Sequence, residues 1–410
     1  MKNYVIIGNG TAALGCIEGI RKVDKDGKIT VVSEENRPVY CRPLISYYLE
    51  DKTDENKMNC RPDDFYEVNG CEVIYGRKAT EIDPEAKTVS LEGGTVLPYT
   101  SLCVATGSSP FVPPFNGLDT VKSKFSFMTM DDAVALKKAV DETSRVLIIG
   151  AGLIGLKCAE GLIGRAGSIT VCDLADRVLP SILDEECAEI VKNHLEEKGI
   201  TLLLGDSAQL FEGHKAIMKS GKTVDFDVLV IAVGVRPNTA IAKNAGCNVP
   251  RGIAVNERSE TTVKDIYAAG DCTQCRDISD DSDKILALLP NAYFQGHAAG
   301  VNMAGGDEVF DKAVPMNSLG LLGLHIMTAG SRSGELLEEK SDLGFKRFFI
   351  GDNKLVGFII MGDTERAGIY TSLIRERTPL DSVDFASMVK VASSISFDKD
   401  IRAKKFGSVV

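Results

Sequence analysis

Two glycine-rich turns carry the residues most suited to chemistry in this sequence. The first covers residues 8–13 and follows the apolar run YVII, and the second covers residues 150–155 and follows VLII. Their members are Gly8, Asn9, Gly10, Thr11, Ala12 and Ala13, and Gly150, Gly152, Leu153, Ile154 and Gly155. Such glycines permit a tight turn and a close approach of the backbone, and the helix that follows presents N–H groups to an anion. Both turns therefore predict a site for a pyrophosphate.

An acidic residue follows each turn at the distance that a bound ribose requires. Glu34 and Asp173 each end a second apolar run, somewhat more than about 20 residues after the first glycine. A carboxylate at this place can bind ribose hydroxyl groups. One such pattern is a weak signal, but two copies in one chain favour dinucleotide binding over two unrelated tight turns.

The elements around the turns follow one order. Each turn lies between an apolar strand and a helix, and a second strand follows, which is typical of half a doubly wound sheet. We therefore predict an α/β chain with two Rossmann-like domains. Three further apolar runs end in small-residue turns, at residues 105–107, 233–238 and 267–272. Beyond residue 305 the pattern changes to a hairpin through Asp352-Asn353 and a helix, which predicts a small α+β domain.

Composition limits the class of protein. The chain has 410 residues with 47 Lys plus Arg and 58 Asp plus Glu, and the formal net charge of −11 argues against nucleic acid as a partner. Its apolar runs are far shorter than the ~18–20 residues of a membrane-spanning helix. The strand that begins at Tyr4 resembles no signal peptide, so we expect a cytoplasmic protein without a membrane partner. Residues 309–410 hold 14 basic and 13 acidic residues, hence a charge of +1, which leaves −12 on the rest.

Eleven scattered cysteines suit a reducing compartment. Cys272 and Cys275 form the single CxxC, which fits either a redox dithiol or two loop thiols without a redox task, and we favour the second. We also favour a packing role for Cys41. Neither the cysteines nor the four histidines have metal-ligand spacing, so we expect no metal site. The acidic run at 276–284 favours a solvated loop over a docking site.

These motifs, taken together, resemble one family. GNGTAA, the ATG at 105–107, GAGLIG, VGVRPN and YAAGD occur in the order found in FAD- and NAD-dependent pyridine nucleotide–disulfide oxidoreductases, and the resemblance extends to about residue 378. RPVYCRPLISYYL is similar to the branch of rubredoxin reductases, ferredoxin reductases and the nitrite-reductase flavin domain. LKCAEGL is also similar to flavin–NAD oxidoreductases encoded beside carbon-monoxide dehydrogenases of anaerobes.

The resemblance implies a domain plan. An FAD domain would comprise residues 1–115 and 237–308, and an NAD domain residues 116–236. A C-terminal interface domain would cover 309–378, followed by a tail at 379–410.

The resemblance also implies which residues bind the cofactors. Asp271 would accept a hydrogen bond from the flavin ribityl chain, Arg42 and Pro43 would line the isoalloxazine, and Ala79 would meet the adenine. Asn291, Gln295 and Gly296 would lie on a helix directed at the flavin pyrimidine ring, and Val233-Gly234 would approach the nicotinamide. Asp173 would favour NADH over NADPH, because a carboxylate repels a 2′-phosphate. The remaining expected cofactor-binding residues are those of the two turns, Glu34, Ala105, Thr106, Gly107 and Gly270.

The sequence departs from the family at three places. Dithiol members carry CxxxxC where this chain has only Cys41, and the reactive thiol of single-cysteine members aligns near Pro43 or Leu44. Lys157 replaces a common glutamate that contacts the nicotinamide or flavin region. Tyr47 replaces the lysine of the ferredoxin-reductase stretch.

The implied activity is electron transfer between NAD(H) and a small one-electron carrier through FAD. The carrier would be a rubredoxin or a ferredoxin-type iron–sulfur protein, and the second similarity suggests a carbon-monoxide dehydrogenase system. Hydride transfer needs no acid–base side chain, so we assign no catalytic residue. The alternatives are an NADH oxidase or disulfide/peroxide reductase that uses Cys41, and a non-catalytic flavin-binding assembly subunit. A homodimer or a complex with other redox subunits stays open, as does docking by the basic tail around residues 399–405.

Overall fold

The computed structural model describes residues 2–341 and 344–397. The chain divides into two compact units. The first comprises Met1–Arg37, Tyr66–Gly107 and Pro237–Val410, and the second comprises Pro38–Phe65 and Ser108–Arg236. Residues 38–65 therefore belong to the unit that contains the second glycine turn, although we expected them in the FAD domain together with the first.

The first unit is built on a parallel sheet in the order β19-β7-β1-β2-β3. Its strands are β1 (Asn3–Ile7), β2 (Lys28–Val32), β3 (Cys71–Ile74), β7 (Ser101–Val104) and β19 (Ile266–Ala268). Ile6 pairs with Val31 on one side and with Cys103 on the other. Because all five strands are parallel, their carboxyl ends meet at one edge, where the first turn follows β1.

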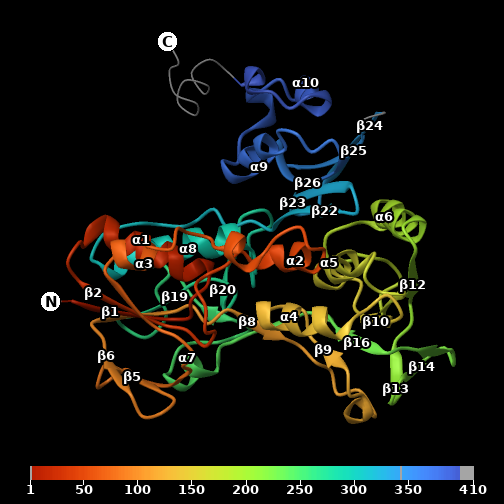
Figure 1. Cartoon of the computed structure of the whole chain (residues 1–410). Coiled ribbons are helices and arrows are strands. Elements are labelled where there is room, and N and C mark those ends of the chain that lie inside the picture. Colours follow the sequence, from red (N-terminus) through yellow and green to blue (C-terminus); the bar gives the residue numbers. More distant parts are fainter. Residues whose placement is uncertain (1, 342–343, 398–410) are drawn as a thin grey trace. The chain divides into compact units, whose positions relative to one another are not determined.

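Two helices pack closely on one face of this sheet. They are α1 (Thr11–Val23) and α8 (Leu289–Met303), which lie side by side (Figure 1). A Cβ at Gly15 would overlap the carbonyl oxygen of Tyr293, and one at Gly296 would overlap that of Ala12. The two backbones touch because glycines lie along both helices. This contact fixes α8 relative to the first turn.

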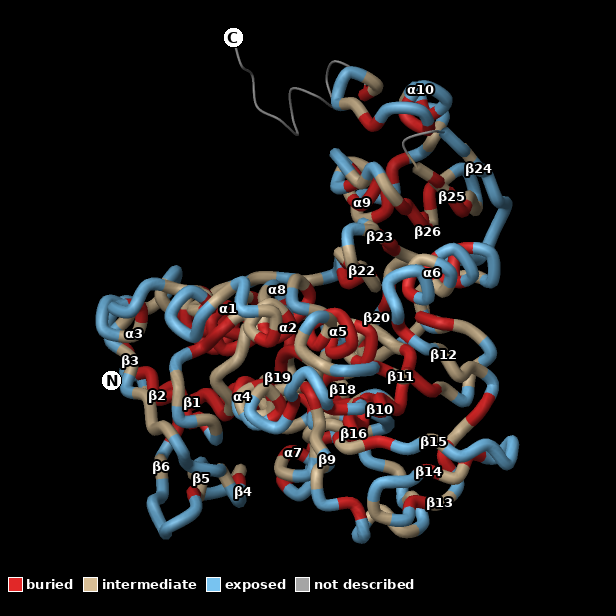
Figure 2. The backbone as a smooth tube through the Cα atoms, turned by 45° about the vertical axis from the view of Figure 1, so that its right-hand side comes forward, coloured by how far each residue is buried: buried red, intermediate tan, exposed pale blue. Residues whose placement is uncertain are grey.

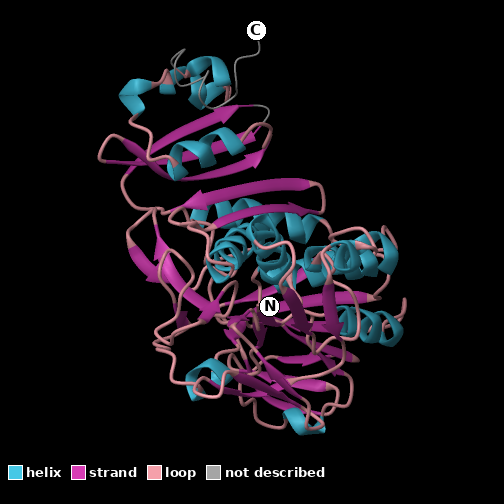
Figure 3. Ribbon diagram, turned by 90° about the vertical axis from the view of Figure 1, so that its left-hand side faces the viewer, coloured by secondary structure: helices cyan, strands magenta, loops and turns pink. Residues whose placement is uncertain are grey.

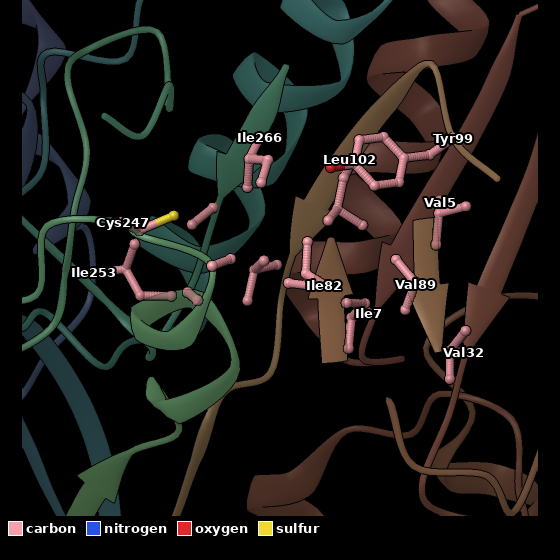
Figure 4. Packing of buried hydrophobic residues seen from close by; sticks show 14 of the residues in the cluster. Val5, Ile7, Val32, Ile82, Val89, Tyr99, Leu102, Cys247, Ile253 and Ile266 are labelled. Carbon is pink, nitrogen blue, oxygen red and sulfur yellow. The ribbon is translucent and has the colours of Figure 1, made fainter. Parts of the chain in front are cut away.

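A three-stranded meander covers the opposite face. It consists of β4 (Ala79–Asp83), β5 (Thr88–Leu91) and β6 (Val96–Pro98). Val5 and Ile7 of β1 pack against Ile82 and Val89 of the meander, as Figure 4 shows. Alternate residues of a strand point to opposite faces, so β1 is buried on both sides. The unit further contains α3 (Phe65–Val68) from its second residue onward, and α7 (Ala240–Asn244), β18 (Ile253–Ala254), β20 (Thr273–Asp277) and β21 (Ser282–Lys284).

The second unit repeats this plan with a sheet in the order β12-β11-β10-β16-β9. The strands are β9 (Lys124–Phe125), β10 (Arg145–Ile149), β11 (Ser168–Asp173), β12 (Ile200–Leu204) and β16 (Val228–Ile231). A second meander contributes Phe211 and Phe226, whose rings meet edge to face at 6.0 Å. Its strands are β13 (Ala208–Glu212), β14 (Lys215–Met218) and β15 (Thr223–Asp225). The helices are α2 (Ile45–Leu49), α4 (Met130–Ala139), α5 (Leu153–Leu162) and α6 (Glu185–Glu197). Figure 2 marks the burial of each residue along these elements.

The last part of the first unit is an antiparallel sheet in the order β22-β23-β26-β25-β24. The strands are β22 (Met316–Leu321), β23 (Leu324–Gly330), β24 (Glu335–Ser341), β25 (Gly344–Gly351) and β26 (Lys354–Gly362), drawn in magenta in Figure 3. The predicted hairpin joins β25 and β26 at Asp352-Asn353, both in the left-handed conformation. The predicted helix is α9 (Gly368–Arg375). The α/β fold class with two Rossmann-like domains and an α+β domain is confirmed.

The C-terminal domain extends beyond residue 378, into the segment that we expected to be a tail. Helix α10 (Phe385–Lys390) contributes Phe385 and Met388 to a core with Phe348 and Tyr370. The Tyr370 hydroxyl donates a hydrogen bond to the Met388 carbonyl, and both residues are buried. Apolar residues beyond 378 thus complete the core. The basic tail residues Lys399, Arg402, Lys404 and Lys405 lie outside the described residues.

Within the described residues, no helix combines the length and apolar character that crossing a membrane requires. The same residues contain no cluster of three or more His, Cys, Asp or Glu side chains suited to hold a metal ion.

Candidate nucleotide-binding sites

The first turn requires glycine at its first position. Gly8 has φ +108°, and a Cβ there would overlap the Ala105 carbonyl oxygen at the end of β7. The Gly8 N–H donates to Val32 O at 2.8 Å, which ties the turn to β2. The turn is therefore held between both neighbouring strands, and any side chain at Gly8 would force them apart.

The helix that follows begins with N–H groups directed at open space. Gly10 is the N-cap of α1, and no side chain of the described part of the chain caps it. A Cβ at Gly10 would meet no protein atom within 4 Å. Uncapped N–H groups and the positive end of a 13-residue helix suit a pyrophosphate.

Asn9 supplies a further polar group at this turn. Its Oδ1 accepts a hydrogen bond from the Tyr66 hydroxyl at 2.7 Å, which orients the amide. Its Nδ2 is buried and has no partner among residues 2–341 and 344–397. A buried donor without a partner costs about 1–3 kcal/mol, so a ligand oxygen at this place would remove a penalty. The residues of the first turn thus fit a phosphate or hydroxyl oxygen.

The ATG stretch at the end of β7 is clamped by Asn238. The Thr106 hydroxyl donates to Asn238 O at 2.6 Å, and Asn238 Nδ2 donates to Thr106 O at 2.9 Å. The Asn238 N–H also donates to Gly107 O at 2.9 Å. Gly107 has φ +65° and open space at its missing Cβ. Asn238 belongs to the VGVRPN motif, but the sequence alone did not indicate that it holds the ATG stretch.

Gln295 positions the turn that carries Asp271. Its Oε1 accepts hydrogen bonds from the Gly270 N–H at 2.8 Å and the Thr273 hydroxyl at 2.9 Å. Asn291, one helical turn earlier, is buried and donates from Nδ2 to Val314 O at 3.0 Å. Its Oδ1 has no partner in the described ranges. The side chain of Gln295 is therefore used to shape the loop, whereas Asn291 has one acceptor left for a ligand.

Glu34 and Ala79 lie at the outer side of the first unit. The Glu34 carboxylate is largely exposed and 3.4 Å from Lys78 Nζ. Ala79 begins β4 and pairs with Leu91. Glu34 follows β2 near the carboxyl end of that strand, the edge of the sheet at which the first turn also lies.

The second turn has the same plan with tighter packing. Gly150 has φ +118°, and a Cβ there would overlap the Ala232 carbonyl oxygen. A Cβ at Gly155 would overlap the carbonyl oxygen of Gly150 itself. Gly152 is the N-cap of α5 and has open space at its missing Cβ, and no side chain of the described residues caps the helix. This turn also fits a pyrophosphate.

Asp173 is built into the second turn. Its Oδ2 accepts from the Ala151 N–H at 2.6 Å, and its Oδ1 accepts from the Ala175 N–H at 2.8 Å. Each carboxylate oxygen has a further lone pair for a ribose hydroxyl. Val233 and Gly234 follow β16, and Gly234 O accepts from the Phe111 N–H at 2.9 Å.

Arg42 and Pro43 lie in the second unit, on the short 3₁₀ turn η1 (Arg42–Leu44) before α2. The Tyr40 hydroxyl accepts from the Met130 N–H at 2.9 Å. Helix α2 contacts both α4 and α5, and a Cβ at Gly161 would come within 2.9 Å of Ser46 O. Arg42 and Pro43, which we expected to line the isoalloxazine, are therefore positioned by elements of the second unit.

Lys157 is neutralised by a neighbour on its own helix. Its Nζ forms an ion pair with Glu160, which is 8% exposed, and lies 4.8 Å from the centre of the Tyr47 ring. Lys52 Nζ is 5.8 Å from the same ring. Lys157 and Tyr47, at two of the three places where the sequence departs from the family, thus contact each other. Glu160 follows Lys157 at helical spacing, so the sequence did contain this signal.

The CxxC thiols are packing groups. Cys272 is fully buried, and its thiol is 3.4 Å from both Val104 O and Ala269 O. Burial raises the pKa of Cys272 and of Cys275 to about 12, so both stay protonated near neutral pH.

The acidic run at 276–284, which we expected to be a solvated loop, forms the hairpin between β20 and β21. Its Asp277 is fully buried and pairs with Lys284 at 2.9 Å.

Cys41 has a partner that the sequence did not reveal. Its thiol is hydrogen bonded to that of Cys60, which lowers the pKa of Cys41 to about 7. No spacing rule links two cysteines across an irregular loop, so only the structure shows the pair.

Comparison with known proteins extends these observations. Residues 2–296 match the pyridine nucleotide-disulphide oxidoreductase family, and residues 315–378 match the rubredoxin NAD+ reductase C-terminal domain. The NADH-dependent phenylglyoxylate dehydrogenase subunit epsilon of Aromatoleum evansii is 31% identical over 92% of this chain and 92% of its own length. The NADH-rubredoxin oxidoreductase of Clostridium acetobutylicum is 26% identical, over 88% of this chain and 92% of its own length.

Other relatives are longer. The nitrite reductase of Bacillus subtilis is 29% identical over 96% of this chain, but the match covers only 49% of that protein. Among solved structures, the covalent putidaredoxin reductase–putidaredoxin complex has a TM-score of 0.87 at 23% identity, over 96% of this chain and 99% of the other, which supports the fold. The chain belongs to the pyridine nucleotide-disulphide oxidoreductase family, whose members bind FAD and NAD(H), and it is an oxidoreductase of the rubredoxin/ferredoxin reductase type.

Proposed function

We propose that the protein transfers electrons from NADH through FAD to a small one-electron carrier protein, a rubredoxin or a ferredoxin-type iron–sulfur protein. The observation that carries the proposal is the combination of two open, uncapped glycine turns with a C-terminal domain of the rubredoxin reductase kind. Each turn can bind one dinucleotide. A flavin is the cofactor that can take two electrons from a hydride donor and pass them one at a time to a one-electron acceptor.

The first turn is the proposed FAD site. The N–H groups at the start of α1 and the Asn9 amide would hold the pyrophosphate, and Glu34 the adenosine ribose. Asp271, on the turn that Gln295 holds through the Gly270 N–H, would orient the ribityl chain. FAD, when bound, accepts a hydride and returns electrons singly, and the chain's own residues bind and orient it.

The second turn is the proposed NADH site. The start of α5 would hold the pyrophosphate, and Asp173 would bind the ribose hydroxyls from a position fixed by two backbone N–H groups. Val233 and Gly234 would contact the nicotinamide. Because hydride transfer requires orientation and no proton relay, we assign no acid or base.

The choice of a rubredoxin or ferredoxin-type carrier rests on the relatives of this chain. The Clostridium protein is named for rubredoxin, and the C-terminal match is to rubredoxin reductases. The relatives reported above give no support for a link to carbon-monoxide dehydrogenase.

A second candidate activity is reduction of O₂ or of a disulfide. The Cys41 thiol, with its pKa lowered to about 7, is the observation in its favour. Against it, Cys41 precedes the family's reactive position near Pro43.

Steady-state NADH consumption separates the two activities. The FAD-loaded protein is assayed anaerobically with oxidised rubredoxin or ferredoxin, and separately with O₂ and with glutathione disulfide. Faster turnover with a carrier protein supports the proposal. Turnover with O₂ or the disulfide alone would replace it with the second candidate.

A further inference from the structure

The second unit holds two cysteines on neighbouring extended segments. Tyr40 and Asn59 form an antiparallel bridge. On either side of it, the Cys41 N–H donates to Met58 O at 2.8 Å and the Cys60 N–H donates to Val39 O at 3.1 Å. Cys41 and Cys60 therefore occupy diagonal positions of the same ladder, where side chains share one face.

The two thiols contact each other and are partly exposed. Both are free cysteines, and both residues are partly exposed. The Cys60 thiol donates to the Cys41 sulfur, and the Leu44 N–H, which donates to Cys41 O at 2.9 Å, lies close to that sulfur. Together they outweigh the opposing effect of partial burial and lower the pKa of Cys41 to about 7. The same hydrogen bond, together with burial, raises the pKa of Cys60. Cys41 is thus the nucleophile of the pair, and Cys60 is the thiol that stays protonated.

The other partly exposed thiols differ from this pair. Burial raises the pKa of Cys71 to about 11 and that of Cys275 to about 12. Neither has a cysteine partner within the described ranges. A thiolate next to a second thiol is the arrangement that thiol–disulfide exchange needs.

We propose that Cys41 and Cys60 form a redox-responsive pair that reacts with a low-molecular-weight disulfide and closes to an intramolecular disulfide. The proposal concerns the thiols alone and does not depend on the proposed electron transfer. It also differs from the family's substrate disulfide chemistry, because Cys41 lies outside the family's reactive position.

The reaction balances in two steps. The Cys41 thiolate attacks one sulfur of the small disulfide, forms a mixed disulfide and releases one thiol, which takes the proton that Cys41 has lost. The Cys60 sulfur then attacks Cys41 Sγ and displaces the second thiol, which takes the Cys60 proton. Two cysteine thiols are oxidised, and one small disulfide is reduced to two thiols.

Closure would join the two ends of the segment that carries η1 and α2. This segment includes Arg42 and packs α2 on α4 and α5. The cross-link would therefore restrict the segment in which we expect flavin-edge residues.

The test uses the FAD-loaded protein and glutathione disulfide, without NADH. After incubation, free thiols are alkylated and the protein is mapped by mass spectrometry. We expect wild-type protein to lose two hydrogens and to yield a Cys41–Cys60 cross-linked peptide. Cys60→Ser should instead retain glutathione on Cys41. Cys41→Ser should react at least about tenfold more slowly at Cys60. Cys71→Ser, a partly exposed thiol outside the pair, should cross-link as wild type does.

Two results would overturn the proposal. One is wild-type protein that keeps both thiols, or carries stable glutathione without the cross-link. The other is a folded Cys60→Ser protein without glutathione on Cys41. Wild-type mapping decides the question by itself if either variant of the pair fails to retain its flavin.

Discussion

The two glycine turns share one sequence pattern but are supported in different ways. In the first unit, α1 rests on α8 through direct backbone contact, and the ribose-side carboxylate of Glu34 is exposed beside Lys78. In the second, Gly155 lies against the turn itself, and the carboxylate of Asp173 accepts one backbone N–H bond from the turn, at Ala151, and one from Ala175.

The difference concerns preorganisation. Asp173 is held in place before any ribose binds, because backbone N–H groups of Ala151 and Ala175 fix its carboxylate. Glu34 has no such support from its turn, and the rigidity of the first site comes from helix packing and from the Asn238 clamp on the ATG stretch. Similar turns therefore predict different responses to mutation.

The largest effect is expected from alanine at the first glycine of either turn. Gly8→Ala and Gly150→Ala each place a methyl group into a carbonyl oxygen at positive φ. We expect a loss of about 3 kcal/mol or more in the free energy of unfolding. Gly8→Ala should lose FAD, whereas folded Gly150→Ala should keep FAD and lose NADH binding, as measured by the flavin to protein absorbance ratio and by NADH titration.

Gly368→Ala is the matched control, because a Cβ there meets no atom within 4 Å. It should stay within about 0.5 kcal/mol of wild type. A Gly8→Ala protein with wild-type stability and FAD content would refute the described packing of the first turn.

The second prediction separates folding from binding. Gly10→Ala and Gly152→Ala add a methyl group where the protein leaves open space, so both variants should fold. The methyl group would occupy the space proposed for the pyrophosphate. Gly10→Ala should weaken FAD binding at least about tenfold, near 1.4 kcal/mol, and Gly152→Ala should do so for NADH. Unchanged dissociation constants in equilibrium titrations would place the pyrophosphates elsewhere.

The third prediction concerns the two carboxylates. Wild-type protein should prefer NADH over NADPH at least about tenfold in kcat/KM, because Asp173 repels a 2′-phosphate. Asp173→Asn should reduce that preference, since the repelling charge is lost. Glu34→Gln should leave it unchanged and affect FAD retention only. Equal kcat/KM values of wild type for both nucleotides would contradict the role of Asp173.

The smallest effect is expected at two aspartates, Asp24 and Asp227, whose partners Tyr4 and Arg145 lie at the start of β1 and β10. Asp24 accepts a hydrogen bond from the Tyr4 hydroxyl, and Asp227 pairs with Arg145 at 3.0 Å; these contacts lower the pKa of each carboxyl to about 2. A lowered pKa stabilises the fold above about pH 4, and the contribution is lost as the pH falls towards 2.

Urea unfolding of Asp24→Asn and Asp227→Asn at pH 7 and pH 3 measures how much each carboxylate contributes to the free energy of unfolding. The Asp227 pair is exposed, so Asp227→Asn should cost about 1 kcal/mol or less at pH 7, and the cost should shrink at pH 3 and in high salt. The cost of Asp24→Asn should also shrink at pH 3 but change less with salt, because the tyrosine is neutral. A larger cost at pH 3 than at pH 7 for either variant would contradict the assignment.

The sequence sufficed for features that depend on local pattern. The two turns, their strands and the hairpin at Asp352-Asn353 follow from glycine spacing, apolar periodicity and turn residues. It did not suffice for contacts between distant segments. The packing of residues 38–65 with the second unit, the Cys41–Cys60 contact and the burial of α10 all depend on tertiary contacts that no local pattern encodes.

Anaerobic stopped-flow absorbance tests the central claim, that electrons pass from NADH through FAD to a one-electron carrier. The FAD-loaded protein is mixed with one equivalent of NADH and then with oxidised rubredoxin or ferredoxin. We predict loss of the flavin absorbance near 450 nm on the first mixing. Its full recovery on the second mixing should consume two carrier molecules per flavin. Flavin absorbance that NADH bleaches but that only O₂ or a disulfide restores would contradict the account.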